Sequence, residues 1–126
     1  MLPLLKARAR VLLFDDDASM QRLVTTLLKR EGYRVDVVSA GADAIAKIAK
    51  NDYGALLLDL MAPTEGGLTV IKHLREKHPK LLRRVVLVTA SPESVLKSVE
   101  GDVAEIVRKP FEAAELIAAV GRVVAK

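Results

Sequence analysis

The chain has 126 residues, of which 51% are hydrophobic and only 3% aromatic. A chain of this length forms one domain, and its core must be built from Leu, Val, Ile and Ala, a composition typical of helices layered on a sheet. The absence of Cys excludes disulfides, thiolate metal sites and a cysteine nucleophile.

Lys and Arg (20) outnumber Asp and Glu (16), which gives a net charge of +4. The basic residues are scattered and never interleaved with aromatic residues, so they do not indicate direct nucleic acid binding. The first residues lack the pattern of a signal peptide, and no apolar run reaches the ~20 residues of a membrane span. We therefore expect a cytoplasmic protein with no membrane association.

Short apolar runs alternate with helical patterns along the chain. In chain order, strand patterns at 11–14, 33–38, 55–60, 85–88 and 104–107 are followed by helical patterns at 18–31, 41–50, 68–78, around 95–99 and around 116–123. Gly32 and Pro79 end the first and third helices. Five strands alternating with five helices predict an α/β fold with a parallel sheet, right-handed crossovers and helices on both faces.

Acidic residues follow the first strand directly. Asp15, Asp16 and Asp17 are adjacent, and holding three carboxylates at a sheet edge is unfavourable unless a cation neutralises them. Asp17 has an ordinary explanation, because Asp is favoured as the N-cap of the helix that follows. Capping explains Asp15 and Asp16 less well, so a cation or an ammonium group is expected beside them.

Polar side chains also follow three other strands. Because ligands bind beyond the carboxyl ends of parallel strands, these side chains and the acids of the first strand are expected to form one site. They are Asp59 after the third strand, Thr89 and Ser91 after the fourth, and Lys109 after the fifth. Taken singly, Asp59 could be a turn former, Thr89 an ordinary strand residue and Lys109 a surface lysine.

The motifs at these strand ends resemble those of response regulator receiver domains of two-component signalling. They are Phe14-Asp15-Asp16-Asp17, Leu58-Asp59-Leu60-Met61-Ala62-Pro63 with Gly67, Val88-Thr89-Ala90, and Arg108-Lys109-Pro110-Phe111. The resemblance covers about residues 8–125 and implies a single receiver domain over 1–126. It also implies a flavodoxin-like (βα)5 doubly wound sandwich, with a five-stranded parallel sheet of order 2-1-3-4-5.

The resemblance implies Mg²⁺-dependent transfer of a phosphoryl group from a histidine kinase phosphohistidine to Asp59. It assigns Asp16 and Asp59 as direct ligands of Mg²⁺ or Mn²⁺, Asp15 as the holder of a metal-bound water, and the Met61 backbone carbonyl as a further ligand. Oxygen ligands and octahedral geometry are what Mg²⁺ prefers, so the residue types suit this assignment. Such a domain catalyses its own phosphorylation and dephosphorylation but is not otherwise an enzyme.

The same resemblance assigns Lys109 and Thr89 to the phosphoryl oxygens and makes Lys109–Pro110 a cis peptide bond. Thr89 and the residue three before the lysine form the switch in this family, where the second position is usually Tyr or Phe. Here it is Ile106, whose few rotamers and missing polar tip predict a smaller or different switching motion. Phosphorylation chemistry does not depend on this position.

The implied partners are a sensor histidine kinase or phosphotransfer protein, and a downstream protein target or a missing effector domain. A homodimer through the fourth helix, fifth strand and fifth helix is a further expectation. The first alternative function is a degenerate receiver that binds a partner without phosphorylation. A small phosphatase would need a general acid after Asp59, where Leu60 and Met61 stand, and a flavin module would not place three acids in its first loop.

Overall fold

The computed structural model describes residues 9–60 and 66–125, and it shows one parallel sheet. The strands are β1 (Arg10–Phe14), β2 (Arg34–Val38), β3 (Ala55–Leu58), β4 (Val85–Thr89) and β5 (Glu105–Arg108). Their order in the sheet is β2-β1-β3-β4-β5, with every neighbouring pair parallel. The predicted flavodoxin-like α/β fold and its strand order are confirmed.

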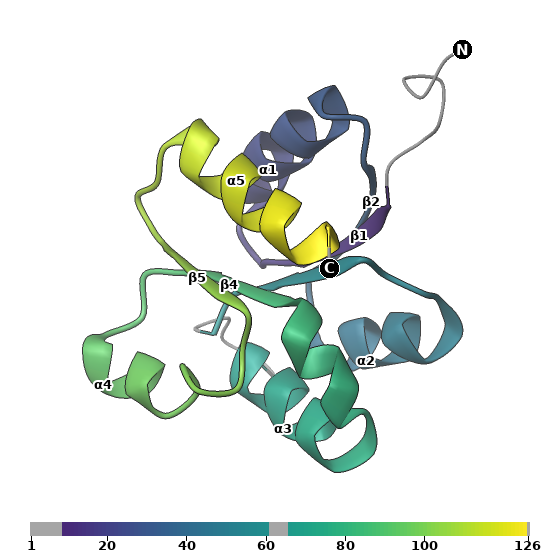
Figure 1. Ribbon diagram of the computed structural model, residues 1–126, viewed down its shortest axis with the longest axis vertical. Coiled ribbons are helices and arrows are strands. Elements are labelled where there is room, and N and C mark those ends of the chain that lie inside the picture. The colour runs from purple at the N-terminus through teal and green to yellow at the C-terminus, as the bar shows by residue number, and fades with distance from the viewer. Residues whose placement is uncertain (1–8, 61–65, 126) are drawn as a thin grey trace.

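Helices cover both faces of this sheet (Figure 1). They are α1 (Ala18–Arg30), α2 (Gly41–Lys50), α3 (Gly67–Lys77), α4 (Glu93–Lys97) and α5 (Ala113–Val124), with a 3-10 helix η2 (Pro79–Arg84) between α3 and β4. Figure 1 shows α1 and α5 on one side of the strands and α2, α3 and α4 on the other. The described residues include no helix with the length and apolar character needed to cross a bilayer.

The core is divided by the sheet into two layers because successive strand residues point to opposite faces. In β1, Leu12 and Phe14 belong to the cluster packed against α2 and α3, whereas Val11 and Leu13 belong to the cluster packed against α1 and α5. Every residue of β3 is buried, as expected of a central strand covered on both faces. The polar residues at the carboxyl ends of the strands therefore lie at the edge of a sheet that is buried on both faces.

Local sequence signals explain where the helices begin and end. The Asp17 carboxylate accepts hydrogen bonds from the backbone N–H groups of Ser19 (2.8 Å) and Met20 (3.2 Å), so it is the N-cap of α1. Gly32 follows α1 with a φ of 92°, a left-handed conformation that glycine adopts without strain. Both predictions, the Asp17 cap and the stop at Gly32, are confirmed.

After Pro79 the chain forms η2, since a proline at the first position of a helix removes no hydrogen bond. The fourth helix is five residues long, in agreement with the short helical pattern expected around 95–99. One residue differs from what the apolar spacing of α1 indicates. Leu23 has the spacing of a buried residue but is 47% exposed, because Val24 and Leu28 fill the narrower strip that faces the sheet.

Candidate functional site

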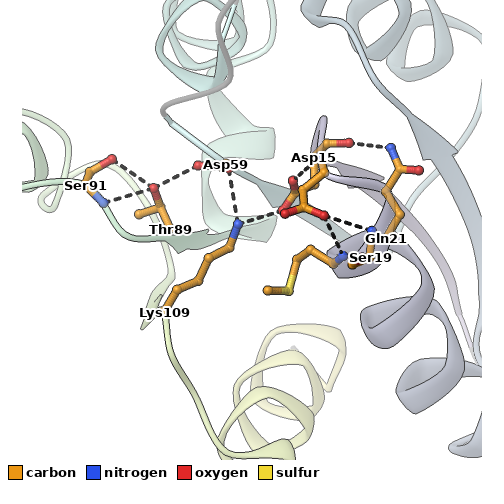
Figure 2. Close-up of polar contacts among 9 residues, drawn as sticks. Asp15, Ser19, Gln21, Asp59, Thr89, Ser91 and Lys109 are labelled. Atoms are coloured by element: carbon orange, nitrogen blue, oxygen red, sulfur yellow. Dashed lines mark hydrogen bonds and ion pairs between the residues drawn. The ribbon is translucent and has the colours of Figure 1, made fainter.

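Two buried aspartates lie side by side at the carboxyl edge of the sheet. Phe14 and Leu58 are register partners in β1 and β3, so the residues that follow them, Asp15 and Asp59, are brought together. The backbone N–H of Asp59 donates to the carbonyl of Phe14 at 3.1 Å, which extends the pairing by one residue. Asp15 is 2% exposed and Asp59 8% exposed, and Figure 2 shows both side chains next to that of Lys109.

A third carboxylate, that of Asp16, is exposed and lies beside these two. One carboxylate oxygen from each of Asp15, Asp16 and Asp59 lies within 4.8 Å of the other two. We call these three side chains the acidic pocket. Oxygen atoms at this spacing, from two buried groups and one open to solvent, match the donor set of a divalent cation that keeps several water ligands.

Lys109 reaches the acidic pocket from the loop after β5. Its Nζ donates to Oδ2 of Asp15 at 2.8 Å and to Oδ2 of Asp59 at 3.2 Å (Figure 2). Burial by itself lowers the pKa of Lys109, but the hydrogen bond to Asp15 and the charges of Asp59 and Asp15 together raise it above the ordinary value. Lys109 is therefore a permanent cation within the pocket. The Lys109–Pro110 peptide bond is cis, as the family resemblance implies.

Thr89, the last residue of β4, holds the other oxygen of Asp59. Its buried hydroxyl donates to Oδ1 of Asp59 at 2.9 Å and lies 2.8 Å from the hydroxyl of Ser91. The backbone N–H of Ser91 also donates to the Thr89 hydroxyl oxygen, at 3.3 Å. Both oxygens of Asp59 are thus oriented by named donors, Thr89 on one side and Lys109 on the other.

Gln21 was missed as a site residue in the sequence. Its Nε2 donates to the backbone carbonyl of Asp15 (Figure 2). The same atom also donates to the hydroxyl of Ser39, at 2.9 Å. It therefore ties the ends of β1 and β2 together behind the acidic pocket. A polar residue in the second turn of a helix carries no signal for such a contact, because the partner lies across a loop.

The structure brings together five of the residues singled out in the sequence: Asp15, Asp16, Asp59, Thr89 and Lys109. Met61, whose backbone carbonyl was expected to ligate the metal, lies outside the described residues. Ile106 lies in β5 opposite Leu87 of β4 and packs, partly buried, against the core cluster on the α3 side. Its expected role in switching stays a prediction.

Comparison with known proteins identifies the family. Residues 11–121 match the family model of the response regulator receiver domain. The chain belongs to the response regulator receiver family. The curated relatives include the transcriptional regulatory protein ResD of Bacillus subtilis, 33% identical over 110 residues, which are 86% of this chain and 45% of ResD. The DNA-binding response regulator MtrA of Mycobacterium tuberculosis is 32% identical over 115 residues, 90% of this chain and 49% of MtrA. The receiver chain thus spans about half the length of these relatives.

Solved structures of response regulators share this fold. A putative response regulator from Chloroflexus aurantiacus is 30% identical, with a TM-score of 0.84, and the alignment covers 94% of this chain and 99% of that one. The response regulator TrrA from Thermotoga maritima, solved in complex with Mg(2+)-BeF, is 29% identical, with a TM-score of 0.80 and coverage of 90% and 97%. The fold of this chain is therefore that of known response regulators.

Proposed function

We propose that this receiver domain accepts a phosphoryl group on Asp59 from the phosphohistidine of a sensor histidine kinase or phosphotransfer protein. The observation that carries the proposal is the pair of contacts to Asp59, in which Thr89 donates to Oδ1 and Lys109 to Oδ2. A carboxylate held in this way is oriented for attack and has two donors ready for the oxygens of an incoming phosphoryl group.

Asp59 would attack the phosphorus, forming an oxygen–phosphorus bond while the nitrogen–phosphorus bond of the donor breaks and the donor imidazole takes up a proton. Lys109 would place its ammonium on one phosphoryl oxygen, and the Thr89 hydroxyl would turn from Asp59 to another. Attack by water on the phosphorus later releases inorganic phosphate and restores Asp59. The domain therefore catalyses its own phosphorylation and dephosphorylation in this proposal.

The reaction needs a divalent cation, and we assign Mg²⁺ or Mn²⁺ to the acidic pocket. Asp16 and Asp59 would ligate it directly, and Asp15 would hold a metal-bound water. The backbone carbonyl of Met61 would be the remaining protein ligand. The cation supplies charge neutralisation for the phosphoryl group as it approaches three carboxylates. The similar TrrA structure, solved in complex with Mg(2+)-BeF, supports this choice.

Because the receiver spans about half of ResD and MtrA, we propose that phosphorylation acts on an effector domain or on a separate protein target. Thr89 and Ile106 would carry the change to the face made by α4, β5 and α5, where a homodimer could form. A cytoplasmic location fits this proposal, since histidine kinases draw their phosphoryl group from ATP.

The decisive experiment incubates the receiver with Mg²⁺ and acetyl phosphate and follows intact mass. We expect a base-labile gain of one phosphoryl group in the parent, none with EDTA and none in Asp59→Asn. Asp43→Asn, which changes an exposed carboxylate of α2, is the matched control and should be phosphorylated like the parent. No adduct in the parent, with Mg²⁺ bound, would instead favour a degenerate receiver that binds a partner without phosphorylation.

A further inference from the structure

A second cavity opens at the opposite edge of the sheet from the acidic pocket. Its volume is about 530 Å³, and it lies where β1 and β3 begin, between η2 and the last turn of α5. Ligand pockets in proteins commonly enclose about 300–1,000 Å³. Because β1 is five residues long, the two sites are separated by roughly 16 Å along the strand. We call this second cavity the distal cavity.

The lining of the distal cavity is strongly basic. Four cationic side chains surround it, and the single carboxylate among them is that of Asp52. The cations are Arg10 at the start of β1 and three residues of η2, namely Lys80, Arg83 and Arg84. By contrast, the cavity of about 570 Å³ between β2 and α2 is lined by two cationic side chains, Lys47 and Lys50.

Two of these cations are held in place. Arg10 forms an ion pair with Asp36, with Nε 2.9 Å from Oδ2, and donates a hydrogen bond through Nη1 to Oδ1 of Asn51 at 2.9 Å. Arg84 donates through Nη1 to the backbone carbonyl of Tyr53 at 2.7 Å and is also paired with Asp52. These contacts fix two guanidinium groups at the cavity wall, so that little side-chain entropy is lost when they meet a ligand.

The other two cations are not neutralised. Within residues 9–60 and 66–125, the side chains of Lys80 and Arg83 form no ion pair, and both residues are exposed. Since Asp36 offsets Arg10 and Asp52 offsets Arg84, the uncompensated charge of the cavity is that of Lys80 and Arg83. A ligand carrying about two negative charges would balance it.

Apolar side chains complete the wall. Val123 and Val124 of α5 line the cavity beside Ala9. We propose that the distal cavity binds a phosphate-bearing small molecule, with its phosphate between Lys80 and Arg83 and its nonpolar part against the two valines. Ammonium and guanidinium groups are the usual phosphate partners in proteins, and the volume of about 530 Å³ suits a small molecule. The proposal does not depend on phosphorylation of Asp59.

The test is an NMR titration of the ¹⁵N-labelled receiver with inorganic pyrophosphate and, separately, with ADP, in buffer containing EDTA. Without a divalent cation the acidic pocket repels both probes, so binding there is suppressed. We expect saturable shifts of the backbone amides of Arg10, Gly54, Arg84 and Val124. ADP binding more tightly than pyrophosphate would support contact of the ligand with the two valines, whereas equal affinity would contradict that part of the proposal.

The variant Lys80→Gln/Arg83→Gln should weaken binding of both probes roughly fivefold or more, since two unpaired charges are lost. Both residues are exposed, so the fold should survive, which the amide spectrum itself reports. The matched control, Lys72→Gln/Lys97→Gln, removes two exposed charges from α3 and α4 and should leave affinity unchanged. Equal weakening in the two double variants would reveal general charge attraction and overturn the proposal, as would the absence of saturable shifts.

Discussion

The hydroxyl of Thr89 donates to Oδ1 of Asp59 at 2.9 Å, while its oxygen also accepts from the backbone N–H of Ser91. Thr89 is thus bonded to the proposed phosphoacceptor before any phosphoryl group arrives. It is 0% exposed, so the hydroxyl cannot exchange these partners for water. The same hydroxyl is the donor that would bind a phosphoryl oxygen once the Asp59 carboxylate has reacted.

We expect Thr89→Ala to slow phosphorylation by acetyl phosphate roughly 10- to 100-fold, because a hydrogen bond to a charged group contributes about 1.5–3 kcal/mol. Thr89→Ser, which keeps the hydroxyl and loses only a methyl group, should retain most of the rate. Phosphoryl incorporation over time, followed by intact mass, measures both variants. Equal rates for Thr89→Ala and the parent would show that the hydroxyl does not act on the reacting group.

Asp16 is the exposed member of the acidic pocket, so its removal tests the metal site without opening the core. Loss even of a group that only supports a metal ligand costs ~10–100-fold in affinity, and we expect Asp16→Asn to weaken Mg²⁺ binding at least that much. Calorimetry or an NMR titration with Mg²⁺ measures the change. The free energy of unfolding without metal should shift by no more than about 0.5 kcal/mol, as for other surface substitutions.

Asp17→Asn is the matched control for Asp16→Asn. It removes the same charge from the next residue, and Asn caps a helix about as well as Asp, so α1 keeps its N-cap. Mg²⁺ affinity should fall much less than in Asp16→Asn. If the two variants lost affinity equally, Asp16 would act only through its charge and not as a ligand.

The site residues could be predicted because their placement follows from topology. Asp15, Asp59 and Lys109 each follow a strand and Thr89 ends one, and the carboxyl ends of parallel strands meet at one edge of the sheet. The sequence pattern alone did not predict which strands are neighbours in the sheet. The alternation of strands and helices predicts a parallel sheet, whereas the order 2-1-3-4-5, confirmed here, came from the resemblance to the receiver family.

What could not be predicted depends on contacts between distant segments. Gln21 bonds to Ser39, which is 18 residues away and on another strand's end, so no local pattern marks it. Leu23 fits the apolar period of α1 as well as Val24 does, yet only the position of the sheet decides which of the two is buried. The distal cavity likewise joins Arg10, η2 and the end of α5, whose charges look scattered in the sequence.

The hydroxyl of Tyr53 donates to Oδ2 of Asp36 at 2.6 Å, and this bond predicts a loss of stability at alkaline pH. Burial, followed by the hydrogen bond and charge of Asp36, raises the pKa of Tyr53 from 10.0 to about 12. Below pH 10 the phenol is protonated in both states. Above it the unfolded chain loses the proton first, so the free energy of unfolding should fall by about 2–3 kcal/mol as pH rises through the folded pKa.

Tyr53→Phe removes this ionisation. The variant should lose about 1 kcal/mol at pH 7 with the hydrogen bond, and its stability should then decline less steeply than that of the parent between pH 10 and 12. Urea unfolding at pH 7, 10, 11 and 12 measures both effects. Tyr33→Phe keeps Tyr53 and should retain the steep decline. Parallel pH profiles for the parent and Tyr53→Phe would mean that the Tyr53–Asp36 contact does not hold the phenol protonated.

Gly67, the first residue of α3, sets the space behind the proposed phosphoacceptor. A Cβ added there would lie 2.6 Å from the backbone oxygen of Asp59 and 2.9 Å from its carbonyl carbon, and backbone atoms cannot turn aside as a flexible side chain can. We expect Gly67→Ala to cost about 1–3 kcal/mol of stability and to slow phosphorylation, because the Asp59–Leu60 backbone must shift.

In the control Gly121→Ala, nothing lies within 4 Å of the new Cβ, and the residue is inside α5. That variant should gain about 0.5–1 kcal/mol and phosphorylate normally. Urea unfolding measures the stability of both variants, and the rate of phosphorylation by acetyl phosphate measures their activity. A Gly67→Ala variant equal to the parent in both would show that the Asp59 backbone is not confined by α3.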